Sequence, residues 1–113
     1  AHPCTLAFQL LMRALWAQFD AAQANQIRLD QLTDLRRPGV DPERRETVEY
    51  WFNHDNGDLA PLDKDTLRGL LNRTYVLLCE RFGPVHSDRV LKHAVDQVRR
   101  QRPDLETALH ALL

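Results

Sequence analysis

The side chains of this sequence that could bind a metal or act as nucleophiles are few and scattered. They are five histidines, two cysteines and one serine, namely His2, His54, His86, His93, His110, Cys4, Cys79 and Ser87. No His-Glu-x-x-His motif and no pair of histidines four residues apart is present, and two cysteines are too few for a Cys-based zinc site. We therefore expect no metal centre.

Nucleophilic catalysis has no better basis in the sequence. Cys79 follows the apolar run Val76-Leu77-Leu78, where burial disfavours the reactive thiolate. Ser87 is the single serine, and its position fits the N-cap of a helix. The four glycines stand singly, so no glycine-rich phosphate-binding loop is present. The sequence predicts no catalytic residues and no cofactor.

The segment 53–58, Asn-His-Asp-Asn-Gly-Asp, has the composition of a calcium-binding loop. An EF-hand requires an oxygen ligand at position 5, glycine at position 6 and a bidentate acid at position 12. Here Gly57 would occupy position 5, Asp58 position 6 and Lys64 position 12. The pattern fails at all three places, and Asn56-Gly57 is better interpreted as a turn.

Trp16 is the residue that most favours recognition of a protein partner. It shares a stripe with Gln9, Arg13 and Asp20, which we expect to be the water-facing side of an otherwise apolar helix. An exposed tryptophan beside an arginine is typical of interface centres. The alternative is that another helix of the same molecule, such as the terminal one, covers Trp16.

A weaker candidate is Tyr50, which lies among acidic residues of its helix. The predicted protein interface comprises Arg13, Trp16, Asp20 and Tyr50.

A basic helix carries the competing hypothesis of a nucleic-acid-binding regulator. Its basic or titratable residues are Arg89, Lys92, His93, Arg99, Arg100 and Arg102. Cations on one helix face could contact several phosphates and give steep salt dependence. Asp88 and Asp96 dilute this charge, and an ordinary solvated face is the simpler explanation. A helix-turn-helix over residues 29–51 fits poorly, because Glu43, Glu46 and Glu49 would repel phosphates.

Charge is unevenly distributed although the net charge is only −1. Residues 41–65 carry eight acids and three bases, whereas residues 66–102 carry eight bases and three acids. Two arrangements would neutralise these segments: contact across helix faces within one molecule, or head-to-tail contact between two copies.

The apolar periodicity predicts helices over Thr5–Ala24, Leu29–Arg37, residues 42–52, Lys64–Phe82, residues 87–100 and residues 105–112. Asp41-Pro42 and Asp63 are helix-start signals, and Ser87 is the predicted N-cap of the fifth helix. Gly83-Pro84 ends the fourth helix. No alternating strand pattern is present, so we expect an all-α fold: an irregular bundle of five to six helices.

Length and composition agree with one globular domain over residues 1–113. Apolar residues make up 43% and charged residues 27%. Thirteen arginines against two lysines indicate a GC-rich, bacterial source, and we expect a cytoplasmic location. The longest apolar-rich run, Leu6–Phe19, is too short and too polar to span a membrane. The chain begins without Met, as a processed chain or an excised domain would, and a Cys4–Cys79 disulfide would need an oxidising compartment.

These observations favour a small helical protein-interaction module, such as an adaptor, a regulatory subunit or an assembly domain. Its partner would be another protein or a second copy, which makes a dimer plausible. The first alternative is the nucleic-acid-binding regulator using residues 89–102, and the second is a sensor of a small ligand or metal in the bundle core.

Overall fold

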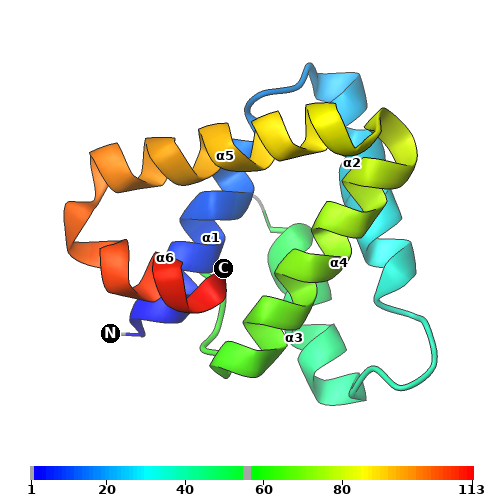
Figure 1. The fold of residues 1–113 in the computed structure, drawn as a ribbon. Coiled ribbons are helices and arrows are strands. Elements are labelled where there is room, and N and C mark those ends of the chain that lie inside the picture. The colour runs from blue at the N-terminus through cyan, green and yellow to red at the C-terminus, as the bar shows by residue number, and fades with distance from the viewer. Residues whose placement is uncertain (1, 55–56) are drawn as a thin grey trace.

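The computed structural model describes residues 2–54 and 57–113. Within these ranges the chain forms six α-helices, one 3-10 turn and no strand: α1 (Pro3–Trp16), α2 (Ala21–Asp34), α3 (Pro42–Phe52), α4 (Lys64–Phe82), α5 (Pro84–Gln101), η1 (Pro103–Leu105) and α6 (Glu106–Leu112). Figure 1 shows them as one irregular bundle. The all-α prediction is confirmed.

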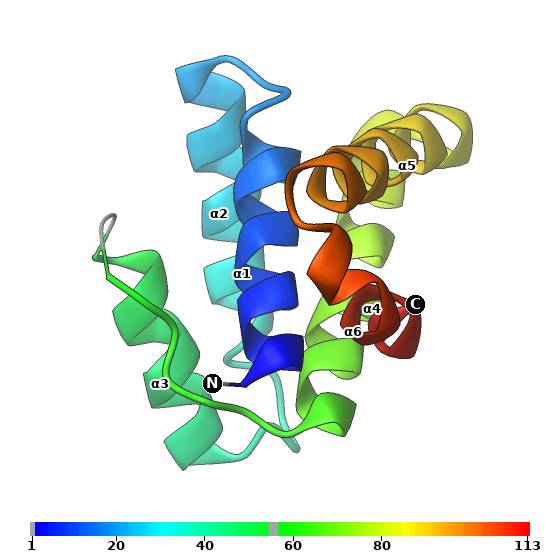
Figure 2. The same cartoon turned by 90° about the vertical axis from the view of Figure 1, so that its left-hand side faces the viewer.

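Helix α1 lies at the centre of the bundle. Its side chains Ala7, Leu11 and Leu15 are completely buried, and the helix packs against α4, α5 and α6. Figure 2 shows α1 between α2 on one side and α5 and α6 on the other. A helix that is apolar around most of its circumference buries its apolar side chains only when other helices surround it.

The first predicted helix is too long, and the second starts too late. The segment 5–24 is not continuous: α1 ends at Trp16, and α2 begins after Asp20. Asp20 is the N-cap of α2, where its carboxylate accepts a 2.8 Å hydrogen bond from the amide of Gln23. As an N-cap, Asp20 has extended backbone angles, and a residue inside a continuous helix cannot have them. The chain therefore breaks between α1 and α2. The predicted helix Leu29–Arg37 is the second half of α2 together with the turn that follows it.

The start of α5 also differs from the prediction. Gly83, at φ 82°, ends α4, and Pro84 follows directly as the first residue of α5. Glycine tolerates this left-handed φ, and proline suits a first helical position because it needs no amide partner there. Ser87 therefore lies inside the first turn of α5, where it is 0% exposed, and it is not the N-cap.

The remaining boundaries follow the sequence signals. Asp41 and Asp63 cap α3 and α4, accepting hydrogen bonds from the amides of Arg44 and Thr66. The predicted fourth helix coincides with α4, and the predicted terminal helix corresponds to η1 and α6. The predicted Asn56-Gly57 turn includes Asn56, which lies outside the described residues.

A polar network in the core joins three helices. Gln31 of α2 accepts a 3.0 Å hydrogen bond from the indole of Trp16 and donates a 2.9 Å bond to the hydroxyl of Thr74 in α4. All three side chains are buried. Buried polar groups that are fully paired fix the relative positions of the elements that carry them.

Candidate binding groove

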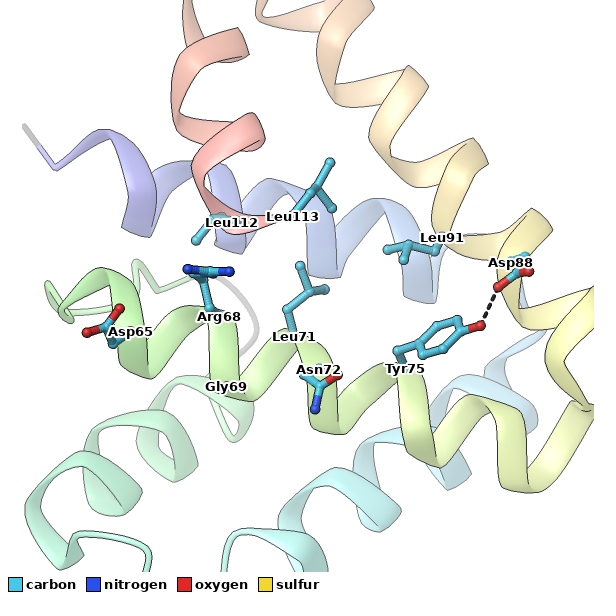
Figure 3. Close-up of a pocket in the computed structure, with 10 residues that line it drawn as sticks. All are labelled: Asp65, Arg68, Gly69, Leu71, Asn72, Tyr75, Asp88, Leu91, Leu112 and Leu113. Carbon is cyan, nitrogen blue, oxygen red and sulfur yellow. Dashed lines mark hydrogen bonds between the residues drawn. The ribbon is translucent and has the colours of Figure 1, made fainter.

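A hollow between α4, α5 and α6 is the candidate site for recognition, and we refer to it as the groove. It encloses about 560 Å³ and is partly open to solvent. Helix α4 forms one wall, the first half of α5 forms another, and the C-terminal end of α6 closes one end (Figure 3). Its lining residues are Asp65, Arg68, Gly69, Leu71, Asn72, Tyr75, Asp88, Leu91, Leu112 and Leu113.

Four leucines give the groove its apolar part. Leu71 and Leu112 are buried, Leu91 is half-buried and Leu113 is exposed. Because they come from α4, α5 and the end of α6, the groove exists only when these helices are packed together. An apolar surface with polar groups around it is the usual composition of a binding site.

Besides Asp65 and Tyr75, α4 contributes two polar side chains to the groove, Arg68 and Asn72. Both are exposed, and neither makes a hydrogen bond or ion pair with another described residue. They lie four residues apart on α4, so they project from the same face of the helix. In Figure 3 the guanidinium of Arg68 lies close to Leu112, and Asn72 lies further along α4. A guanidinium and an amide so placed can bind a carboxylate.

Tyr75 and Asp88 link α4 to α5 at the opposite end of the groove. The phenol of Tyr75 donates a short hydrogen bond to the carboxylate of Asp88, drawn in Figure 3. This bond, together with a smaller effect of the Cys79 side chain, raises the pKa of Tyr75 above its ordinary value of 10.0. The bonded pair therefore links the two helices and leaves the second carboxylate oxygen of Asp88 as an acceptor.

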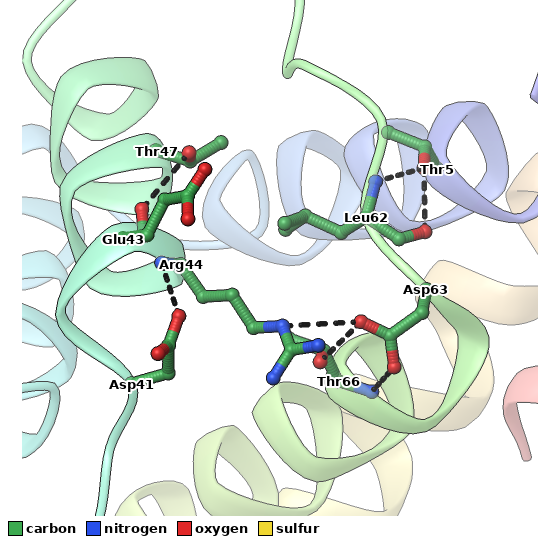
Figure 4. A network of polar contacts seen from close by, with 8 residues as sticks. All are labelled: Thr5, Asp41, Glu43, Arg44, Thr47, Leu62, Asp63 and Thr66. Atoms are coloured by element: carbon green, nitrogen blue, oxygen red, sulfur yellow. Dashed lines mark hydrogen bonds and ion pairs between the residues drawn. The ribbon is translucent and has the colours of Figure 1, made fainter.

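A polar stripe on α1 lies on another side of the molecule and is already occupied. Gln9, 3% exposed, donates to Asp58 and accepts a 2.7 Å bond from the amide of Leu59. Thr5 exchanges two hydrogen bonds with the backbone of Leu62, visible in Figure 4. The expectation that this stripe faces water is wrong, because the chain between α3 and α4 covers it.

Arg13, a predicted interface residue, belongs to that internal contact. Its guanidinium donates a 2.9 Å hydrogen bond to the carbonyl oxygen of Gly57 and lies 5.9 Å from the centre of the Trp51 ring. Arg13 therefore supports the segment that follows α3.

Figure 4 also shows how α3 is attached to the start of α4. The guanidinium of Arg44 lies 3.3 Å from the carboxylate of Asp63, the N-cap of α4. The hydroxyl and amide of Thr66 donate to the same carboxylate and hold the pKa of Asp63 below its usual value. This network is a structural connection between helices.

Trp16 is buried, so the interface interpretation is wrong and the alternative, cover by another helix of the same molecule, is confirmed. The side chain is 8% exposed and lies in the core of the single molecule. Its ring packs against Trp51 at 5.5 Å and Phe52 at 5.3 Å, both from α3, and the guanidinium of Arg28 lies 4.5 Å from its centre. Helices α2 and α3 cover Trp16, in place of the terminal helix that the sequence suggested. Sequence spacing on α1 could not indicate this, because the covering residues are far away in the chain.

The other two predicted interface residues have different surroundings. Asp20 is exposed and serves as the N-cap of α2. Tyr50 is 66% exposed, and its ring stacks on His54 with 3.8 Å between ring centres. The structure therefore does not bring Arg13, Trp16, Asp20 and Tyr50 together on one surface, and only Tyr50 presents an aromatic ring to solvent.

The basic residues of the fifth helix are only partly available. Lys92 pairs with Asp96, Arg99 with Asp96 and Glu106, and Arg102 with Asp104. These cations hold the pKa of Asp96 and of Asp104 below the usual value. Arg89, His93 and Arg100 are exposed and make no ion pair with a described residue.

Sequence reasoning missed the groove because its signal is hidden in an ordinary helical pattern. In the sequence, the polar face of a long amphipathic helix contains Arg68, Asn72 and Tyr75. Almost every surface helix has such a solvated face. Only packing against Leu91 and Leu112 turns that face into the wall of a hollow. The polar face of residues 64–82 was the one available indication.

In the part of the chain that the structure describes, no group of three or more His, Cys, Asp or Glu side chains could hold a metal ion, and Cys4 and Cys79 are free, half-buried thiols. No described helix combines the length and the apolar character needed to cross a membrane. Comparison of the chain with protein-family models, curated proteins and solved structures gave no match.

Proposed function

We propose that this protein is a protein-interaction module that receives an amphipathic segment of a partner in the groove. The observation that carries the proposal is the combination of Arg68 and Asn72, both without a partner among the described residues, with an apolar surface made by three helices. Stable recognition usually requires buried apolar anchors surrounded by a polar rim, and the groove provides both.

The chemistry of the groove specifies the partner. The leucines accept apolar side chains spaced along one face of a helix or a short extended segment. Arg68 and Asn72 would bind a carboxylate of the partner, since arginine pairs with carboxylates through two parallel hydrogen bonds. At the other end, Asp88 would accept from a donor group. A segment with apolar anchors and an acidic residue near one end fits this description.

Site-specific photo-crosslinking tests the proposal. A photoreactive amino acid is introduced at Asn72 in the groove and, as a matched control, at Asn25, an exposed asparagine on α2. In cells of the source organism, position 72 should give a discrete crosslinked species that position 25 does not give. The species should disappear when Arg68→Glu is added.

Equal crosslinking at both positions, or a species unaffected by Arg68→Glu, would refute a role for the groove. Native mass spectrometry of the same sample separates the sensor alternative, because a small molecule in the groove would add a defined mass without any protein adduct.

The nucleic-acid alternative has less support. Three of the six predicted residues, Lys92, Arg99 and Arg102, are engaged by neighbouring carboxylates. Arg89, His93 and Arg100 remain, and phosphate contacts from two arginines give weak, salt-sensitive binding. Retention on DNA or RNA at low salt that falls when both become Ala would favour this alternative over the groove.

A further inference from the structure

The two oppositely charged segments of the chain do not neutralise each other within one molecule. Residues 41–65 carry a net charge of −5 and residues 66–102 a net charge of +5. Among the described residues, no ion pair joins the first segment to the second. The cations of the basic segment that form long-range pairs contact α2 instead, as Arg73–Asp34 and Arg81–Asp30, and Arg36 after α2 pairs with Glu49 of the acidic segment.

The acidic segment presents an exposed stripe on α3, which we call the acidic face. It consists of Glu43, Glu46, Tyr50 and His54. The spacing of the first three residues places them on one side of the helix. Neither glutamate makes an ion pair with a described residue, whereas the cations of α3 are engaged, Arg44 by Asp63 and Arg45 by Glu49.

The basic segment presents a matching stripe on α5, which we call the basic face. It consists of Arg89, His93 and Arg100, which are all exposed and lie at positions i, i+4 and i+11 on one side of the helix. Asp96 lies between them, but Lys92 and Arg99 neutralise it. Asp88 keeps one negative charge beside Arg89, because its hydrogen bond comes from the neutral phenol of Tyr75, and the two arginines outweigh it. The uncompensated charge of this face is positive.

The two faces lie on opposite sides of the molecule. Helix α5 lies along one edge of the bundle and α3 along the other, in both views (Figures 1 and 2). One copy therefore cannot bring its own acidic face to its own basic face. A second copy in the same orientation can place its basic face against the acidic face of the first.

We infer that copies of this protein associate head to tail, with the acidic face of one copy on the basic face of the next. The carboxylates of Glu43 and Glu46 meet the cations of the basic face, and the exposed ring of Tyr50, 66% accessible, is the anchor that loses water beside them. Complementary charge steers association and fixes its direction. Because the two surfaces differ, the contact is heterologous and adds copies in series until a ring closes.

Sedimentation velocity of the wild-type protein provides the first test. In about 20 mM salt, the weight-average mass should rise with protein concentration beyond that of a dimer. About 0.5 M salt should weaken association roughly tenfold, because exposed charges are then screened within a few ångströms. A protein that stays monomeric at millimolar concentration in low salt overturns the inference.

Two variants test the direction of the contact. Glu43→Gln/Glu46→Gln/Tyr50→Ala removes the acidic face and keeps the basic face, while Arg89→Ala/Arg100→Ala does the reverse. Each alone should be monomeric, and an equimolar mixture should form a 1:1 dimer that does not grow, because only one competent pair of faces remains. Circular dichroism checks that both variants are folded.

Matched charge changes away from both faces serve as controls. Lys64→Ala and Glu80→Gln alter exposed residues and should leave association unchanged. A mixture of the two face variants that stays monomeric, or that forms larger species, overturns the head-to-tail arrangement. So does a symmetric dimer that either face variant forms by itself.

Discussion

The indole N–H of Trp16 donates a 3.0 Å hydrogen bond to the side-chain oxygen of Gln31 in the centre of the bundle. The same glutamine donates to Thr74 and contacts the sulfur of Met12. One amide thus satisfies polar groups from α1 and α4. This relationship explains why a tryptophan can lie inside the molecule without leaving its N–H group unpaired.

Replacement of Gln31 by Leu should lower the free energy of unfolding by about 2 kcal/mol, because the buried indole N–H loses its acceptor. Urea denaturation followed by circular dichroism measures the change. Gln26→Leu is the matched control: Gln26 is exposed on the same helix and bonds only to Asp30. Equal effects of the two substitutions would show that the buried network contributes little.

Replacement of Ser87 by Ala separates the predicted role of this residue from its observed one. If Ser87 were an N-cap, its replacement by Ala would lower the free energy of unfolding of the protein by about 1 kcal/mol. In the structure its hydroxyl is fully buried and has no hydrogen-bond partner. Removing an unpaired buried hydroxyl should stabilise the protein, by up to about 1 kcal/mol. Thermal and urea unfolding decide between these opposite signs, and a loss of stability would contradict the structural assignment.

Asp34 should make the stability depend on pH in the acid range. Two hydrogen bonds from Arg73, at 2.6 and 3.0 Å, hold the pKa of this carboxyl below its usual 3.8 in the folded state. The resulting stabilisation is complete above the unfolded pKa of 3.8 and is lost as the pH falls through the lower folded pKa. Urea unfolding measures the free energy of unfolding over roughly pH 2 to 6, a range that brackets both pKa values. For Asp34→Asn this free energy should fall less steeply with decreasing pH than for the wild type. Parallel curves for variant and wild type would rule out this contribution.

The Tyr75–Asp88 bond should be visible in a titration of the phenol. In a Tyr50→Phe background Tyr75 is the single tyrosine, and its ultraviolet absorbance change should occur well above pH 10.0, because the protonated phenol donates a hydrogen bond to the Asp88 carboxylate. Asp88→Asn should bring the transition down toward that value. Because the folded pKa is raised, this bond stabilises the fold below the unfolded pKa of 10.0, and its contribution is lost as the pH rises through the folded pKa. A titration unchanged by Asp88→Asn would contradict the contact.

Features of the fold that depend on local backbone chemistry could be predicted from the amino-acid sequence alone. The all-α class, the starts of α3 and α4 and the break between α4 and α5 follow from Asp41-Pro42, Asp63 and Gly83-Pro84. Capping side chains, proline and glycine act on amides and carbonyls within a few residues, so their effect can be recognised without knowledge of distant segments. The break before Asp20 was missed because the apolar run continues across it.

Which faces of the helices are covered depends on packing between segments that are distant in the sequence. Trp16 is enclosed by Trp51 and Phe52, the stripe of Thr5, Gln9 and Arg13 is covered by residues 57–62, and the groove requires α4, α5 and α6 together. Burial depends on which distant segments pack against a face, whereas helical periodicity records only that a face is apolar or polar. For this reason periodicity indicated the helices of this protein but could not indicate the groove.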